Sequence, residues 1–317
     1  MQYNPMELTH EILERLEQLE EKYSVMGQDI LSYLDGLLYA DYLTYWDYIH
    51  LDTLLSLQTP ETPFPDEKIF ILYHQITELY FKLSLLAIEQ LLDAEAPGLD
   101  FFKRQVTRVN RYFDSLVSSF DIMVEGMDRD EFLKFRMSLL PASGFQSAQY
   151  RKIELMSTDM YRLVHGSKRE EVKPDSPVEE LYQRLYWKSG ATELATGKKT
   201  LTLKQFEQKY AEEFQDLGRE MRHRNLWQAY LRLPEADRQD EELKQLMRHY
   251  DFNIEVRWPL SHLRSAVRYL DAKPQVIEAT GGTNWQDYLP PRKQRIIFFP
   301  DLWTDEELDN WGKSIRF

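Results

Sequence analysis

The chain has 317 residues, of which 43% are hydrophobic and 13% aromatic, enough for a sizeable core in one large domain or two. Its net charge of −14 argues against nucleic-acid and anionic-membrane partners, and the lack of cysteine excludes disulfides, zinc–thiolate sites, iron–sulfur clusters and cysteine-ligated haem. The charged N-terminus has no apolar signal core, and no apolar run approaches the roughly 20 residues that span a bilayer, so we expect a cytoplasmic protein.

Helical periodicity runs through much of the first half of the chain. Apolar residues recur at helical spacing over 8–24, and the opposite face is polar, so we expect residues 1–28 to pack on a neighbouring subunit. Residues 29–58 are also predicted helical, until three prolines within 59–65 exclude continuation of the helix. Further helices are predicted over 67–93 and 99–125.

The second half changes character before it returns to helix. Residues 166–204 are rich in Ser, Lys, Glu, Pro and Gly, which predicts a surface excursion or short hairpin. Helices are predicted over 204–232 and 238–272, and the apolar run 296–299 fits a short strand or a docked segment. The sequence therefore predicts an all-α fold, with residues 29–317 as one multi-helix bundle that carries this small excursion.

A turn of small residues, Pro141-Ala142-Ser143-Gly144, follows Arg136 closely. Gly144 permits a close backbone approach, Ser143 offers a hydroxyl group, and Arg136 can hold a carboxylate with two parallel N–H bonds. Aromatic residues, among them Phe132 and Phe145, surround the turn. This combination predicts a site for a planar acid, although a plain helix–loop–helix corner with a surface arginine has the same pattern.

Among the seven histidines, His262 lies on the most distinctive helical face. Trp258, His262, Ala266 and Tyr269 share that face, and apolar residues form the adjoining one. An imidazole in apolar surroundings suits a proximal haem ligand, because a porphyrin needs an apolar slot with one nitrogen donor. The competing interpretation is a core histidine that bonds a backbone carbonyl.

Other candidate sites have weaker patterns. His74 and Glu78, four residues apart, could share a metal ion or simply a hydrogen bond. A di-iron bundle needs two Glu-x-x-His pairs on core-facing helices, but the matches Glu7/His10 and Glu220/His223 lie in charge-dense segments that we expect to be exposed. The turn at 280–283 lacks the flanking strand and helix of a phosphate site, and is compatible with a loop that closes over a ligand or with a plain turn.

Several motifs, taken together, resemble the tryptophan 2,3-dioxygenase family, within the histidine-ligated haem aromatic oxygenases. They occur in the family's order over about residues 40–155 and 250–305. The matching pieces are Tyr45-x-x-Tyr48-x-x-Leu51-Asp52, Asp66-Glu67-x-x-Phe70-Ile71, His74-Gln75-x-x-Glu78-Leu79-x-Phe81-Lys82, Phe135-Arg136 with Pro141 to Ser147, Arg151-x-x-Glu154, Trp258-x-x-x-His262 and Thr280-Gly281-Gly282 with Tyr288-Leu289.

The resemblance implies an activity and an assembly. It implies an all-α enzyme that holds haem b, ferrous in the active form, and that uses O₂ to cleave the indole C2–C3 bond of L-tryptophan, giving N-formylkynurenine. It also implies a homotetramer, a dimer of dimers, in which N-terminal helices complete a neighbour's pocket. The expected partners are thus a small aromatic amino acid and O₂.

The resemblance also implies roles for individual residues. His262 corresponds to the axial ligand of the haem iron, with Trp258 and Ser143 beside the haem. Arg136 corresponds to the arginine that pairs with the substrate carboxylate, and Thr280 to the threonine at the substrate's ammonium and carboxylate end. The aromatic residues that line the substrate pocket correspond to Tyr45, Tyr48 and Phe132. No residue is assigned as a catalytic acid or base.

Two departures from the family pattern bear on the activity. The family has a distal histidine that contacts the indole N–H, and Pro65 stands at that position here. The related indoleamine dioxygenases also lack such a histidine. The family's Gly-Thr-Gly-Gly reads Ala279-Thr280-Gly281-Gly282, and Asn284-Trp285 follow, so we expect a reshaped loop. Two alternatives therefore stay open: a haem-dependent monooxygenase of a tryptophan-, indole- or tyrosine-like acid, and a non-catalytic haem or amino-acid binding protein.

Overall fold

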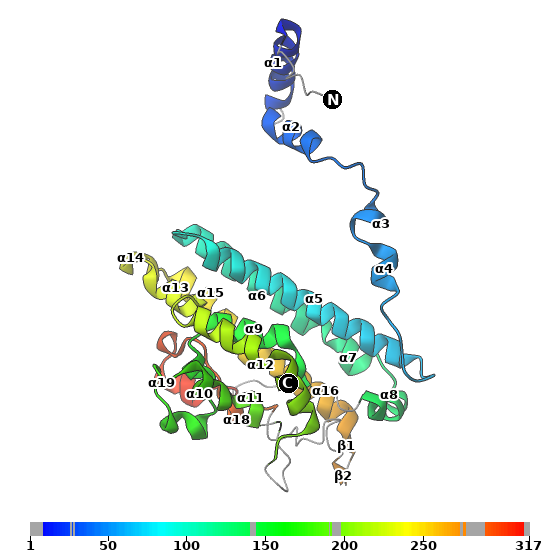
Figure 1. The fold of residues 1–317 in the computed structure, drawn as a ribbon, viewed down its shortest axis with the longest axis vertical. Helices are drawn as coiled ribbons and strands as arrows, with labels where there is room; N and C mark the ends of the chain where they lie inside the picture. The colour runs from blue at the N-terminus through cyan, green and yellow to red at the C-terminus, as the bar shows by residue number, and fades with distance from the viewer. Residues whose placement is uncertain are drawn as a thin grey trace. The chain divides into compact units, whose positions relative to one another are not determined.

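The computed structural model describes residues 9–25, 27, 29–139, 144–189, 191, 198–272, 275–276 and 289–313. Helices form nearly all the regular structure in these ranges (Figure 1), which confirms the predicted all-α class. Strands β1 (Asp271–Ala272) and β2 (Gln275–Val276) form a short antiparallel pair, with Asp271 opposite Val276. Among the helices so described, none combines the length and apolar character needed to cross a bilayer.

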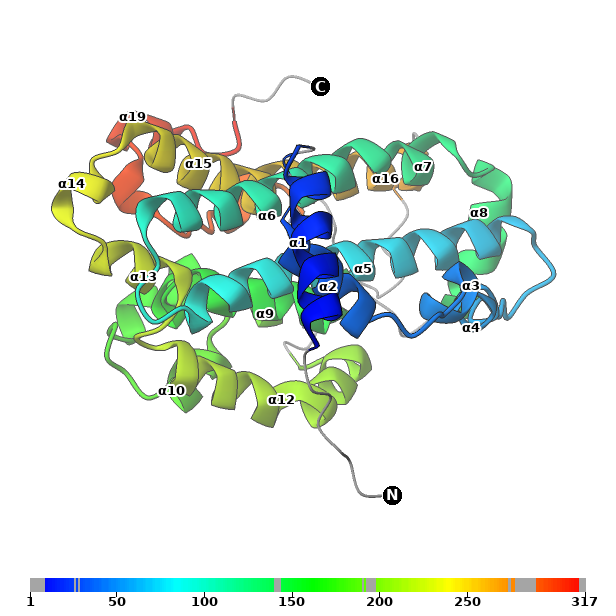
Figure 2. The ribbon, with the colours of Figure 1, turned by 90° about the horizontal axis from the view of Figure 1, so that it is seen from above.

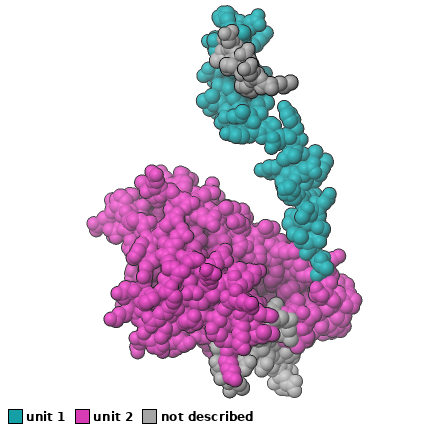
Figure 3. Space-filling view, viewed as in Figure 1, with its two compact units in different colours: residues 1–59 teal, residues 60–317 magenta. Residues whose placement is uncertain are grey.

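The chain divides into two compact units, with residues up to Thr59 in the first and residues from Pro60 onwards in the second (Figure 3). The sequence indicated an earlier boundary, after residue 28. Within the first unit, the Tyr23 and Tyr33 rings stack at 4.2 Å and join its first helix to its second. The Pro-rich segment 59–65 marks the boundary instead, since proline excludes helix continuation there.

The first unit consists of short helices with no buried residue among them. Its helices are α1 (His10–Ser24), α2 (Ile30–Leu38), α3 (Tyr45–Tyr48) and α4 (Leu51–Leu55). The helix predicted over 29–58 is therefore interrupted, and Tyr42 and His50 adopt left-handed backbone angles with φ of 52° and 51° at the interruptions. Many apolar side chains of this unit, such as Leu37 and Leu38, remain exposed.

The second unit is a bundle built on long helices (Figure 2). Helices α5 (Asp66–Asp93) and α6 (Leu99–Ser119) lie side by side, α9 (Ala148–Ser157) packs on α5, and α12 (Leu201–Met221) packs on α9. Helix α15 (Glu241–Phe252) packs on α6 and continues through a π-helical turn (Asn253–Arg257) into α16 (Trp258–Leu270). The shorter helices are α7 (Asp121–Glu125), α8 (Arg129–Phe135), α10 (Val178–Gln183), α11 (Tyr186–Ser189), α13 (Leu226–Arg232), α14 (Glu235–Arg238), α18 (Pro291–Gln294) and α19 (Asp305–Asp309).

The 166–204 segment differs from the expected surface excursion. Its described part contains α10 and α11, and Leu181, Tyr182 and Trp187 are buried in the main core. The apolar residues of this segment are few but spaced to face inward, and the Trp187 ring packs edge-on against Phe206 of α12, with centroids 5.5 Å apart. The basic stretch at its end begins α12, which Thr200 caps, rather than forming a hairpin.

The C-terminal region docks on the bundle as an irregular segment, the second of the two expected alternatives for 296–299. Asp251 of α15 accepts hydrogen bonds from the backbone N–H groups of Phe298 and Phe299, at 3.0 and 3.1 Å, and from the Trp303 indole at 3.1 Å. Both phenylalanine side chains are fully buried. One buried carboxylate thus holds a segment nearly fifty residues further along the chain.

Candidate functional site

Helix α16 is fixed to the bundle along the face that carries His262. The Tyr269 hydroxyl donates to the carbonyls of Val124 and Met127, both at 3.3 Å, and the Ser265 hydroxyl donates to the carbonyl of Met123 at 3.4 Å. These bonds satisfy carbonyl groups at the end of α7 and just beyond it, where helix termini leave acceptors without intrahelical partners. The His262 helix therefore has a defined position against α7.

The His262 imidazole lies among aromatic rings with one nitrogen engaged. Its centroid is 4.4 Å from the Trp258 ring and 4.7 Å from the Phe120 ring. Nδ1 lies 3.1 Å from the Trp258 carbonyl, and because a carbonyl only accepts, Nδ1 carries the proton. Burial lowers the pKa of His262 to about 4, so the ring is neutral at pH 7. The Nε2 lone pair is then available as a ligand.

A second imidazole, that of His74 on α5, belongs to the same region. A positive charge on His74 would further lower the pKa of His262, so the two rings lie within electrostatic reach. His74 stacks on Phe70 at 4.0 Å, and its Nδ1 bonds the Phe70 carbonyl at 2.7 Å. Its side chain is exposed on one side, yet the surrounding protein lowers its pKa by burial. No pattern in the sequence predicted that His74 and His262 lie close together.

The His74–Glu78 metal pair is not formed. His74 bonds a backbone carbonyl, whereas the Glu78 carboxylate accepts from the Gln149 amide at 2.8 Å. In the described ranges, no group of three His, Cys, Asp or Glu side chains comes together as metal ligands. A haem iron needs only one protein donor, and the neutral, apolar setting of His262 fits that requirement.

Arg136 is the first residue of the 3₁₀ turn Arg136–Leu139, directly after α8. It is only 5% exposed, and burial lowers the pKa of its guanidinium. The preceding Phe135 is fully buried, and the N-cap Asp128 fixes the start of α8 by accepting from two backbone N–H groups. A guanidinium with restricted access to water is suited to bind one anionic group strongly.

Phe132 connects the Arg136 segment to the histidine region. Its ring is 4.6 Å from that of Tyr269 on α16 and 6.3 Å from that of Phe70 on α5. Phe70 in turn stacks on His74. The structure thus brings Phe132, Arg136, Trp258 and His262 into one part of the second unit, through an aromatic layer.

Several predicted site residues belong to the first unit or lie outside the described residues. Tyr45 and Tyr48 belong to the first unit and are 71% and 74% exposed. Ser143, Thr280 and the loop at 279–287 are outside the described residues. Pro65 is exposed and immediately precedes α5, so its side chain supplies no hydrogen-bonding group there.

The di-iron interpretation gains no support. Glu7 is outside the described residues, and His10 bonds Glu14 at 3.3 Å on an exposed helix. Glu220 and His223 are both exposed, and Glu220 pairs with Arg224. The Thr280–Thr283 turn also lies outside the described residues.

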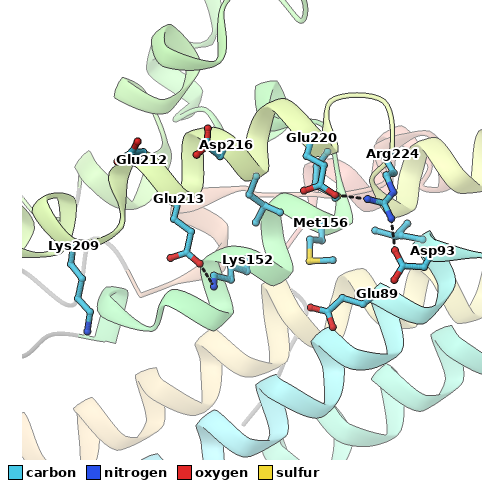
Figure 4. A pocket seen from close by; sticks show the side chains of 13 residues that line it. Glu89, Asp93, Lys152, Met156, Lys209, Glu212, Glu213, Asp216, Glu220 and Arg224 are labelled. Carbon is cyan, nitrogen blue, oxygen red and sulfur yellow. Dashed lines mark hydrogen bonds and ion pairs between the residues drawn. The ribbon is translucent and has the colours of Figure 1, made fainter.

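A separate cavity of about 640 Å³ opens between α5, α9 and α12 (Figure 4). Charged side chains dominate its lining, and several pair with one another: Lys152 with Glu213, and Arg224 with both Glu220 and Asp93. Such a surface does not suit a porphyrin or an indole ring. The aromatic region around His262 remains the candidate site.

The site also contains groups that spacing alone did not identify. Phe120 lies in a segment predicted only as helix, and Phe70 belongs to a matching motif but was given no role in the site. On α9, the buried Arg151 and Glu154 bond to each other, and both act electrostatically on the buried Glu255 of the π-helical turn. Their Arg-x-x-Glu spacing was one signal available in the sequence.

Comparisons with known proteins identify the family of the chain. The family model of tryptophan 2,3-dioxygenase matches residues 36–255, well over half of the chain. Relatives named tryptophan 2,3-dioxygenase include those of Ruegeria sp. (strain TM1040), 30% identical over 81% of this chain and 89% of its own length, and of Ruegeria pomeroyi, 28% identical over 84% and 92%. A shorter match, to the protein of Nocardioides sp., is 43% identical over 35% of this chain and 43% of its own length. The chain therefore belongs to the tryptophan 2,3-dioxygenase family.

Proposed function

We propose that this protein is a haem-dependent dioxygenase that cleaves the indole C2–C3 bond of L-tryptophan with O₂ to give N-formylkynurenine. Membership of the tryptophan 2,3-dioxygenase family supports the activity. The single observation that carries the haem site is the state of His262: a half-buried, neutral imidazole among aromatic rings, with Nδ1 engaged by a carbonyl. Such a ring presents one nitrogen lone pair in apolar surroundings.

His262 would hold the haem iron through Nε2, with Trp258 and Phe120 flanking the imidazole. The hydrogen bond from Nδ1 to the Trp258 carbonyl fixes the tautomer and orients the ring, as hydrogen bonds to the other ring nitrogen of metal-bound histidines do. When bound, the haem supplies the activation of O₂, and the protein supplies position and electrostatics.

Arg136 would bind the tryptophan carboxylate. Its burial means that this charge-assisted bond forms with little competition from water, and such bonds contribute about 1.5–3 kcal/mol. The neighbouring Phe132 offers an aromatic surface to the indole ring. Holding both ends of the substrate fixes the distance of the indole from the reacting oxygen.

The remaining site assignments rest on the family resemblance. We propose that Thr280 binds the ammonium and carboxylate end of the substrate, that Ser143 lies beside haem and substrate, and that Tyr45 and Tyr48 line the pocket. The exposure of both tyrosines in the first unit is compatible with a contribution to the pocket of another subunit.

One observation favours a second candidate, monooxygenation of a tryptophan-, indole- or tyrosine-like acid. Pro65, at the start of α5, offers no side-chain donor or acceptor, so it cannot orient an indole N–H. An aromatic acid that has no indole N–H to be oriented would then bind as readily as tryptophan.

The test is a visible spectrum of the purified, haem-reconstituted protein, with and without L-tryptophan, under ascorbate and air. The proposal expects a histidine-ligated haem spectrum and a product that has gained two oxygen atoms, both labelled when ¹⁸O₂ is used. A product with one added oxygen would establish the monooxygenase instead. Haem binding without oxygen consumption would leave only a binding protein.

We also propose a homotetramer, arranged as a dimer of dimers. Support comes from α5, where Leu72, Ile76, Leu79, Leu83 and Leu86 are 38–52% exposed. Their alternating spacing of four and three residues is that of a seam between two helices. A second copy of the chain would cover this stripe of apolar side chains.

A further inference from the structure

Helix α9 presents a buried polar face to the core. It starts at the N-cap Ser147, directly after the turn that contains Gly144–Gln146, and its Arg151 and Glu154 are 6% and 1% exposed. The Arg151 guanidinium contacts the two carboxylate oxygens of Glu154 at 3.0 and 2.9 Å. Tyr186 of α11 accepts from Arg151 at 2.9 Å, and its hydroxyl donates to Glu154. One cation and one anion thus balance each other in a dry environment.

The π-helical turn before α16 adds another carboxyl group to this environment. Glu255 is 4% exposed, and no described group of the protein donates a hydrogen bond to its Oε1. Glu154, Arg151 and Asp251 are the charged groups that act on it. Asp251 is already satisfied by its N–H donors from the C-terminal segment, and Arg151 is already paired. A negative charge on Glu255 would therefore have no counter-ion of its own, which is costly in a buried site.

The same helix, α9, also holds the backbone of the turn. The Tyr150 hydroxyl donates to the carbonyl of Ile254 at 2.8 Å, and the Ser157 hydroxyl bonds that of Tyr250 at 2.6 Å. Single π-helical turns frequently occur at functional sites, and this one leads directly into the helix of His262. The buried cluster thus joins the helix that follows the Arg136 segment to the helix that carries His262.

We propose that Glu255 is a positioning residue, and that Glu154 and Glu255 hold a single proton between them, which keeps the π-helical turn docked on α9. The role in orienting His262 rests on the proposed haem function, whereas the shared proton does not. The chemistry is that of two carboxyl groups and one guanidinium in a water-poor volume, where one acid stays neutral.

Burial acts in the same direction on both acids. It raises the pKa of Glu154 to about 7 and that of Glu255 well above its usual range, and the repulsion between the two adds to the second shift. The unfolded chain releases these protons at lower pH than the folded chain. Stability is therefore highest at acidic pH and falls as pH rises from the ordinary glutamate range to the folded pKa, by up to about tenfold in the folding equilibrium constant per pH unit for each proton retained.

The first test uses the protein without haem, so it is independent of catalysis. Melting temperatures are measured between pH 5 and 8 for wild type, Glu255→Gln and the exposed control Glu170→Gln. Glutamine imitates the neutral acid but does not titrate, so Glu255→Gln should lose less stability than wild type as pH rises, while Glu170→Gln follows wild type. Parallel profiles for wild type and Glu255→Gln would overturn the shared proton.

The double variant Glu154→Gln, Glu255→Gln adds a second criterion. Either single variant leaves one carboxyl group within electrostatic reach of Arg151, whereas the double variant leaves the guanidinium buried without either acid. The double variant should therefore lose far more stability than the two single variants summed. Simple additivity would show that the two carboxyl groups do not act as a pair.

The role in positioning is tested on the haem-loaded protein. The Soret band of wild type should shift as pH rises through the range in which the pair loses its proton, and Glu255→Gln should abolish that shift. A flattened stability profile with an unchanged Soret profile would confirm the proton but refute its effect on His262. Failure of all variants to bind haem would contradict the proposed function and leave the stability result standing.

Discussion

At the scale of single residues, burial decides what each functional group can do. His262 is neutral because protein surrounds it, and its orientation follows from one bond to the Trp258 carbonyl. Arg136 keeps its charge, since guanidinium groups do not lose their proton in proteins. Its burial strengthens the electrostatic attraction between the guanidinium and any anion that it binds. The same physical condition thus produces a metal donor at one position and an anion receptor at another.

Replacement of His262 by alanine should remove the histidine-ligated haem spectrum. The reason is that the alanine side chain has no nitrogen atom to bind the iron. The measurement is the Soret band after haem reconstitution, with the exposed His223→Ala as a control that should retain the wild-type band. An unchanged Soret band in His262→Ala would remove His262 from the ligand role.

Replacement of Arg136 by alanine should weaken tryptophan binding by about 10- to 100-fold, since a charge-assisted bond of about 1.5–3 kcal/mol is lost. Haem affinity should change little. Tryptophan titration of the ferrous protein measures the effect, and the exposed Arg111→Ala is the matched control. Equal losses of haem and tryptophan affinity would contradict the assignment.

Residue types and spacing made some of these positions predictable. An arginine beside a small-residue turn, and a histidine four residues after a tryptophan, are local patterns. The approach of His74 to His262, and of Glu154 to Glu255, depends on how separate helices pack, and one sequence contains no measure of that. Burial of Glu255 also opposes the expectation that glutamate stays exposed.

At the scale of elements, tertiary contacts determined where helices end. The predicted helix over 29–58 is broken at Tyr42 and His50, where a left-handed backbone is not foreseen by apolar periodicity. Residues 178–189 form core helices despite their polar composition, because a few well-spaced aromatic residues suffice to bury one face. The long helices α5 and α6 were predicted well, since their periodicity extends over many turns, but the helix predicted over 204–232 is divided into α12 and α13.

The docked C-terminal segment should depend on Asp251. Burial raises the pKa of Asp251 to about 7, although its N–H donors favour the carboxylate, so the group is ionised at pH 8. At that pH, Asp251→Asn should lower the free energy of unfolding by about 1.5–3 kcal/mol, because bonds to a charged acceptor are weakened. Urea unfolding measures the change. The exposed Asp175→Asn should behave as wild type, and an equal effect of both would deny Asp251 this role.

At the scale of the whole molecule, the chain consists of two units, and a large amount of apolar surface is exposed in each. The described helices of the first unit contain no buried residue, so these helices form no core of their own. Contiguous apolar surface of this extent is typical of a chain that associates with other copies. The homotetramer is an expectation from the family resemblance, whereas the sequence did not predict the division of the chain after Thr59.

The apolar stripe of α5 should control assembly. The double variant Leu79→Glu, Leu83→Glu places charges on residues that are 52% and 42% exposed in the single chain, so the fold should survive while association weakens. Light scattering after size-exclusion chromatography should show a species smaller than the tetramer. Lys82→Glu, an exposed change on the same helix, is the control. A double variant that remains tetrameric would assign the interface to another surface.

The π-helical turn at Asn253–Arg257 determines the direction in which each side chain of the following helix, α16, points. Such a turn corresponds to one extra residue in an otherwise α-helical stretch, and each residue advances an α-helix by about 100°. Deleting a single residue there would restore regular winding and swing the imidazole of His262 away from Phe120, with the composition of α16 untouched. The direction in which the His262 nitrogen points therefore depends on the number of residues in the π-helical turn as much as on the identity of any side chain.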